Sequence, residues 1–160
     1  MNPPQHPIFQ RMQLSAAALR TVAERRYGDA VALLGTKSNE RANGAMYMAG
    51  FVIECLLKAH MVEEYSWLTN GARPTNGTDE QKQIWSLCYR SHDLDEILGY
   101  LPGLCDRLGA RTLRSGRGPL LLLQQVSATW TIYARYSSRL ATHQEATKFV
   151  EVIKELKLCL

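Results

Sequence analysis

The amino-acid sequence predicts an all-α fold, an antiparallel bundle of about five helices. Apolar residues recur at intervals of three and four along most of the chain, and no stretch alternates apolar and polar residues over a useful strand length. The chain has 160 residues, of which 46% are hydrophobic and 21% are charged. This balance is typical of one globular domain and excludes a disordered tail, a collagen-like fibre and a coiled-coil rod. We expect a single domain over residues 1–160, with residues 1–10 as an irregular arm.

Two long helices are expected in the first half of the chain. One apolar face runs along a helix over Met12–Leu34, and Gly35–Asn39 is typical of a helix stop and a turn. A second helix is expected over Glu40–Tyr65. Its middle, Ala45–Ala59, is apolar on nearly every side, which is typical of a central helix packed by several neighbours. Residues 66–80 are rich in turn formers and predict a surface loop.

Three further helices complete the predicted bundle. Asp93 is followed three residues later by a glutamate, a capping-box pattern that predicts the start of a short helix. Two glycines and a proline indicate a loop over Arg111–Pro119, and a fourth helix is expected from about Pro119 to about Tyr136. Thr142 and Glu145 form a second capping box. It predicts the start of a final helix with an apolar stripe.

The cysteines and the apolar runs bear on the compartment. None of the four cysteines has the spacing of a metal-ligand set; they are Cys55, Cys88, Cys105 and Cys159. We expect reduced, mostly buried thiols, no metal and no cofactor, with disulfides as the weaker alternative. No apolar run reaches the ~18–20 residues that cross a bilayer, and the first residues lack the pattern of a secretory signal. We therefore expect a cytoplasmic protein with no membrane association.

Positive charge gathers in the second half of the chain, which has a formal net charge of +4. From Arg107 through Gln144 there is no aspartate, glutamate or lysine, but there are six arginines: Arg107, Arg111, Arg114, Arg117, Arg135 and Arg139. Guanidinium groups bind phosphate oxygens through paired N–H donors, and a basic zone attracts polyanions. We expect the first five to bind phosphate and all six to form one surface around the opening turn of the final helix. The alternative is that they lie on several faces and pair with distant carboxylates.

Three segments of the chain resemble, in order, the signatures of HEPN domains (higher eukaryotes and prokaryotes nucleotide-binding). The Ala-x-Tyr-x-Ala-Gly-Phe-x-Ile-Glu-x-x-Leu-Lys-Ala pattern of Ala45–Ala59 is similar to the second helix of that family. Ser91–Leu98 resembles its His-Asp-Leu segment, and Trp130–Tyr136 resembles its aromatic-then-Arg-Tyr stretch. The resemblance covers roughly residues 15–157. It implies a compact antiparallel helical bundle, often a homodimer, with a role in RNA cleavage, nucleotide binding or prokaryotic defence and toxin–antitoxin systems.

The resemblance also directs attention to His143. In many members an arginine, four to six residues and then a histidine supply metal-independent ribonuclease chemistry. Here three residues separate Arg139 from His143 and seven separate Arg135 from it, so neither pair has that spacing. As an enzyme, the chain would use His143 as the base for an RNA 2′-hydroxyl, with Arg135 or Arg139 neutralising the phosphorane. The alternative is that His143 is an exposed residue with no such task.

A second polar set is expected to be structural. Glu54 and Lys58 are four residues apart on the most apolar helix, a spacing that pairs them, and His92 can complete the network. The function that these observations favour is binding of RNA or nucleotide phosphates through an arginine-rich surface. The alternatives are a metal-independent endoribonuclease and a non-catalytic subunit that docks a partner nucleotidyltransferase or antitoxin.

Overall fold

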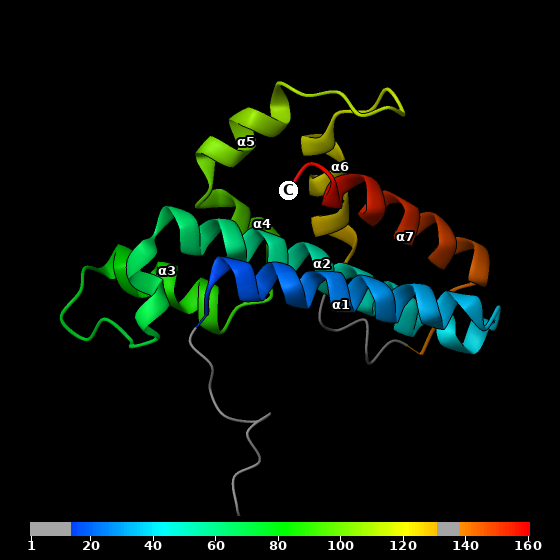
Figure 1. The fold of residues 1–160 in the computed structure, drawn as a ribbon, viewed down its shortest axis with the longest axis horizontal. Helices are drawn as coiled ribbons and strands as arrows, with labels where there is room; N and C mark the ends of the chain where they lie inside the picture. The colour runs from blue at the N-terminus through cyan, green and yellow to red at the C-terminus, as the bar shows by residue number, and fades with distance from the viewer. Residues whose placement is uncertain (1–13, 131–137) are drawn as a thin grey trace, which may run out of the picture.

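The structure, a computed structural model, describes residues 14–130 and 138–160. Within these ranges it contains seven α-helices, one short 3-10 helix and no strand. They are α1 (Ala16–Gly35), α2 (Asn39–Glu64), the 3-10 helix η2 (Ser66–Asn70), α3 (Asp79–Tyr89), α4 (Leu94–Gly99), α5 (Pro102–Gly109), α6 (Pro119–Thr129) and α7 (His143–Lys157) (Figure 1). The predicted all-α class is confirmed, and the described part of the chain has more helices than the five expected.

The helices α1 and α2 form an antiparallel pair that supports the rest of the fold (Figure 1). Each begins with a serine N-cap: the hydroxyl of Ser15 accepts the N–H of Ala18, and the hydroxyl of Ser38 accepts the N–H of Glu40. The turn between the helices is tight, and Lys37 adopts a positive φ of 54° there. The short turn fixes the two helices side by side.

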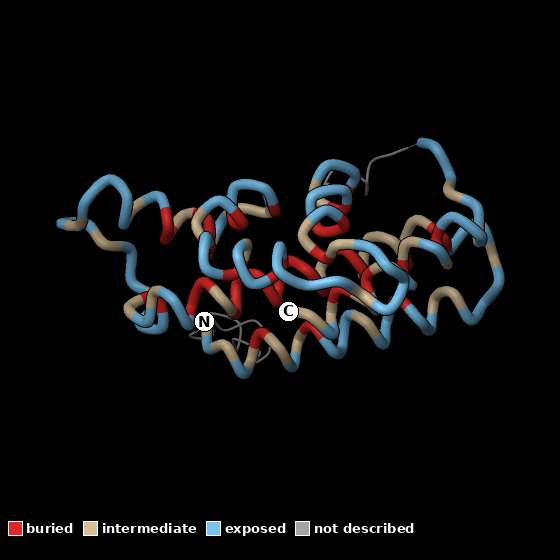
Figure 2. The backbone as a smooth tube through the Cα atoms, turned by 90° about the horizontal axis from the view of Figure 1, so that it is seen from above, coloured by how far each residue is buried: buried red, intermediate tan, exposed pale blue. Residues whose placement is uncertain are grey.

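The central position expected for α2 is confirmed. Its buried residues lie on all sides of the helix, and Figure 2 shows the buried backbone gathered along the middle of the molecule. Among the described residues, α2 is the one helix long and apolar enough to cross a membrane, with a mean hydropathy of 1.4. However, 67% of its apolar window is buried inside the fold, as is typical of a core helix.

The last helix, α7, runs parallel to α2, so the expected antiparallel arrangement is wrong for this pair. At the start of both helices, the backbone N–H of His143 donates to Oδ1 of Asn39 at 2.7 Å. At their far ends, Nε2 of His60 lies 2.7 Å from the carbonyl oxygen of Leu160. The long stretch between the two helices returns the chain to the start of α2, and this return makes the pair parallel.

Two helices were not expected from the sequence. The helix α3 begins with a capping box in which Thr78 and Gln81 satisfy each other's backbone N–H groups. The helix α5 begins with Pro102 at its first position, where the missing N–H costs nothing. The expected loop over residues 66–80 also contains η2. These short elements hold only two or three turns each, too few for their periodicity to stand out.

The helix α6 ends at Thr129, well before the expected end near Tyr136. The hydroxyls of Ser127 and Thr129 near this end donate to backbone carbonyls one turn back in the helix. Trp130 then leaves the helix with an extended ψ of 125°. The helical face expected to be shared by Arg135 and Arg139 involves residues outside the described ranges.

Candidate functional site

Four of the predicted phosphate-binding arginines are exposed on the last turn of α5 and the loop after it, residues 107–117, which we together call the arginine loop. They are Arg107 in the helix and Arg111, Arg114 and Arg117 in the loop. A tight turn shapes this loop. The N–H of Gly116 donates to the carbonyl of Leu113 at 2.9 Å, and the N–H of Leu113 donates to the carbonyl of Arg117 at 2.8 Å. Gly116 has φ 79°, a conformation that favours glycine, and Leu113 packs against the core. The arginines are thus carried on a fixed loop.

The arginines of this loop differ in their partners. The guanidinium of Arg117 lies 3.5 Å from the carboxylate of Glu155, and Arg111 donates to the backbone carbonyl of Cys159 at 3.4 Å. Within the described parts of the chain, neither Arg111 nor Arg114 has a carboxylate within ion-pairing distance. Both guanidinium groups therefore keep their charge available to a ligand.

Arg107 lies nearer to acidic groups. The hydrogen bond from Arg20 holds the pKa of Glu63 below its ordinary value, and the positive charge of Arg107 adds to this effect. Arg107 also shares a cavity of about 190 Å³ with Glu63 and Glu64. Arg107 therefore lies near carboxylates, and Arg117 is ion-paired with one, so Arg111 and Arg114 are the more available of the four arginines.

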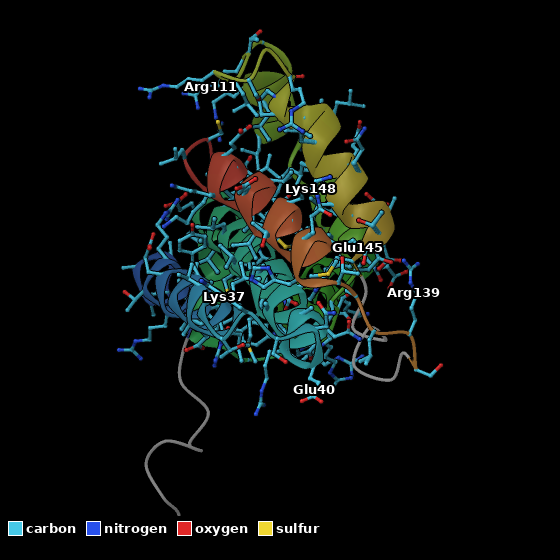
Figure 3. All side chains as sticks on the ribbon, turned by 90° about the vertical axis from the view of Figure 1, so that its right-hand side faces the viewer. Lys37, Glu40, Arg111, Arg139, Glu145 and Lys148 are labelled. Carbon is cyan, nitrogen blue, oxygen red and sulfur yellow. The ribbon has the colours of Figure 1, made fainter. Side chains whose placement is uncertain are left out.

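The arginine loop lies at the closing end of α7, so the single arginine surface expected at its opening turn is wrong. Arg111 contacts Cys159 after the end of the helix, whereas Arg139 pairs with Glu145 at its start, at 3.0 Å. Figure 3 shows Arg111 and Arg139 at opposite ends of α7. Fifteen helical residues span about 22 Å, which separates the two ends. Arg135 lies outside the described residues.

A carboxylate already occupies the opening turn of α7. Thr142 and Glu145 form the expected capping box, with the N–H of Thr142 donating to Glu145 at 2.7 Å. The hydrogen bonds from the backbone and side chain of Thr142 lower the pKa of Glu145. A phosphate at this turn would meet a like charge where the helix dipole otherwise favours an anion. The opening turn is therefore a poor place for phosphate.

His143 is tied into the backbone of the fold. Its Nε2 lies 3.0 Å from the carbonyl oxygen of Leu34 at the end of α1. Because a carbonyl can only accept, this hydrogen bond requires the proton on Nε2, and only Nδ1 is left to act as a base. The backbone N–H of His143 donates to Asn39, so the residue joins α7 to the turn between α1 and α2. This geometry gives His143 a structural task.

The polar network expected from Glu54, Lys58 and His92 is present. Glu54 and Lys58 are only 5% and 8% exposed, and Nζ of Lys58 donates to Glu54 at 2.7 Å. Nδ1 of His92 lies 3.0 Å from both carboxylate oxygens of Glu54. Lys58 also donates to the carbonyl of Ser91 at 2.8 Å, which joins α2 to the loop before α4. The buried charges are therefore paired, as burial requires.

An aromatic cluster lies on the same side of α2. Trp130 is 4% exposed. Its ring centroid lies 6.2 Å from that of Tyr47 in a stacked arrangement and 5.4 Å from that of Phe51 in an edge-on arrangement. The rings of Phe51 and His92 are nearly perpendicular, with their centroids 6.1 Å apart. The close approach depends on Gly50, because a Cβ there would lie 1.9 Å from Nε1 of Trp130. The indole is held in one place by these contacts.

Beside this cluster lies a cavity of about 310 Å³ between α2, the end of α6 and the start of α7. Its apolar lining includes Met46, Trp130 and Phe149, and its polar lining includes Asn43, Arg139 and Glu145. No sequence pattern indicates that these residues meet, because they come from three distant parts of the chain. Of the predicted site residues, Arg139 lines this cavity.

Comparison with protein-family models, with curated proteins and with solved structures finds no match for this chain. The described residues likewise contain no group of histidine, cysteine or acidic side chains that could hold a metal ion. In the described structure, the arginine loop lies at one end of α7 and the cavity beside Trp130 lies at the other.

Proposed function

We propose that this chain is a HEPN-like helical domain that binds RNA or nucleotide phosphates through the arginine loop. The observation that carries the proposal is the fixed, exposed position of Arg111 and Arg114 with no carboxylate within ion-pairing distance among the described residues. Arginine forks in such a position favour phosphate, because they bind two of its oxygens at once. The HEPN resemblance supports the same class of ligand and suggests a prokaryotic defence or toxin–antitoxin setting, often with a homodimer.

Binding is favoured over cleavage by the geometry of His143. The proton on its Nε2 and its bond to Leu34 suit a structural residue, and its spacing from Arg139 differs from the HEPN ribonuclease pattern. Labelled RNA incubated with the protein and EDTA separates the two functions. Binding predicts retention of intact RNA. Cleavage that disappears in the His143→Ala variant would establish the endoribonuclease instead.

The arginine loop is tested by the salt dependence of RNA affinity. We expect the variant Arg111→Ala/Arg114→Ala to weaken binding of a single-stranded RNA and to flatten the plot of log affinity against log salt by roughly 0.7 per lost phosphate contact. The matched control is Arg25→Ala/Arg73→Ala, which removes the same charge from exposed positions far from the loop in sequence. Equal losses in both double variants would show that net charge, and not the loop, attracts RNA.

The remaining alternative is a subunit that docks a partner protein such as a nucleotidyltransferase or an antitoxin. It predicts no RNA retention even at low salt, where phosphate contacts are strongest. In that case the arginine loop has no polyanion to bind, and the proposal is wrong.

A further inference from the structure

The cavity of about 310 Å³ at the start of α7 is separate from the arginine loop and has the features of a ligand site. Its volume lies at the lower end of the range for small-molecule pockets, ~300–1,000 Å³, which suits one planar ring system better than an extended ligand. Apolar and aromatic side chains dominate such pockets, with a few polar groups that fix orientation. Met46, Trp130 and Phe149 supply the first kind of group, and Asn43 and Glu145 supply the second.

The polar part of the lining is built before any ligand arrives. The side-chain amide of Asn43 donates to the carbonyl of Arg139 at 2.8 Å and accepts from the N–H of Ala141 at 2.7 Å. Glu145 is fixed by its capping box with Thr142. These bonds hold the short segment before α7 against α2. Binding of a ligand therefore costs little conformational entropy in these side chains.

The aromatic wall is equally fixed. Trp130 is supported by Tyr47, with an angle of 29° between the rings, and by Phe51, with an angle of 74°. Trp130 is only 4% exposed, but together with the half-buried Phe149 it forms an apolar wall of the cavity against which an unstacked base can pack. Base pockets combine such aromatic contact with hydrogen bonds to the edge of the base. An amide, a carboxylate and a guanidinium line this cavity and provide both donors and acceptors.

We propose that this cavity is a nucleobase site, which takes one unstacked base of the strand whose phosphates the arginine loop binds. The proposal rests on the proposed function for its ligand class. About 22 Å along α7 separate the two features, so a single strand lying on the outer face of this helix reaches both. Lys148, labelled in Figure 3, and Lys154 are both exposed on α7 between the two features, with the exposed Glu151 between them.

The direct test uses uncharged nucleosides, because they lack the phosphate that the arginine loop binds. We expect adenosine or uridine, at millimolar concentration, to shift the indole N–H signal of Trp130 in a ¹H–¹⁵N spectrum. The signals of Trp67 and Trp85 should stay in place, since neither lines the cavity. Loss of one signal in Trp130→Phe assigns it. The proposal is wrong if neither a nucleoside nor RNA shifts the Trp130 signal. It is also wrong if N-acetyl-leucinamide shifts that signal as much as a nucleoside does.

A variant pair and a second probe complete the test. Ala141→Leu fills the cavity, and we expect it to weaken RNA binding by at least about tenfold. Its control is Leu140→Ala, a neighbouring side chain that is 58% exposed and lies outside the lining. An abasic strand, which keeps the phosphates, should bind Ala141→Leu and the unmodified chain equally well. Ala141→Leu that folds normally and keeps full RNA affinity contradicts the base site.

The two proposals fail in different ways. If nucleosides shift the Trp130 signal but the abasic strand does not bind, the base site stands and the arginine loop is wrong as a phosphate surface. If the abasic strand binds but neither nucleosides nor RNA reach Trp130, the arginine loop stands and the base site is wrong.

Discussion

At the residue scale, the contact between Gly50 and Trp130 decides how the end of α6 meets α2. The indole lies directly on the backbone of Gly50, and its N–H is buried with no hydrogen-bond partner among the described residues. An unsatisfied buried donor costs about 1–3 kcal/mol. Apolar packing against Tyr47 and Phe51 must offset that cost, so the position of the ring depends on the space that glycine leaves.

The first prediction concerns that space. We expect Gly50→Ala to destabilise the fold by about 1–3 kcal/mol or more, because its Cβ would lie 1.9 Å from Nε1 of Trp130 and the ring would have to move. Urea denaturation measures the change. The matched control is Gly28→Ala, also inside a long helix, where a Cβ meets nothing within 4 Å. That control should stabilise by about 0.5–1 kcal/mol through helix propensity. Equal effects of the two variants would contradict this account of Gly50.

The second prediction concerns the buried pair of Glu54 and Lys58. Glu54→Gln leaves the ammonium of Lys58 without its counter-charge in a buried place, and we expect a loss of about 3–5 kcal/mol in the free energy of unfolding. Adding Lys58→Met removes the stranded charge. The double variant should therefore lose less than the sum of the two single losses, by more than about 1 kcal/mol. Additive losses in the cycle would show that the pair is not coupled.

At the scale of elements, the sequence predicts the long helices well and the short ones poorly. Periodicity over four or more turns locates α1, α2 and α7 to within a few residues, and the capping box of Thr142 and Glu145 marks the start of α7. The start of α4 at Asp93 was also expected, and the side chain of Asp93 accepts the N–H of Glu96 there. By contrast, α3 and α5 are too short for a periodic signal, and the end of α6 is set by tertiary packing of Trp130.

The third prediction belongs to the junction of α7 with the turn between α1 and α2. His143→Ala removes the hydrogen bond to Leu34, and we expect a loss of about 1 kcal/mol in the free energy of unfolding. RNA affinity should be unchanged, because His143 lies far from the arginine loop and does not line the cavity beside Trp130. Thermal denaturation and RNA titration of the same variant check both statements. If the unmodified chain cleaves RNA, and His143→Ala loses that cleavage but keeps its stability, His143 is a catalytic residue and not a structural one.

At the scale of the whole molecule, the sequence indicates which residues carry the charge but not where the fold places them. The arginine loop is exposed as expected, but the parallel course of α7 brings its closing end to the loop. The network of Glu54, Lys58 and His92 could be predicted from the sequence, because buried charges must pair and residues four apart on a helix face each other. The cavity beside Trp130 depends on long-range packing, which no local pattern encodes.

The last prediction concerns how the stability of the entire fold depends on pH. Burial raises the pKa of the thiols of Cys55 and Cys88 to about 11, and the charge of Glu54 adds to the effect at Cys55. In the unfolded chain a thiol loses its proton near its ordinary pKa of about 8.5. Below that pH both states are protonated, so the thiols have no effect on the pH dependence.

As the pH rises from there toward 11, the unfolded state releases protons that the folded state still holds. The free energy of unfolding should therefore fall with rising pH, by up to about 1.4 kcal/mol per pH unit for each thiol. Urea denaturation under reducing conditions at pH 8 and pH 10 measures the fall. We expect the Cys55→Ala/Cys88→Ala variant to show a smaller fall than the unmodified chain, and Cys159→Ala, which replaces a partly exposed cysteine, to show the same fall. If the double variant loses as much stability as the unmodified chain between these two pH values, the buried thiols do not control this part of the pH profile.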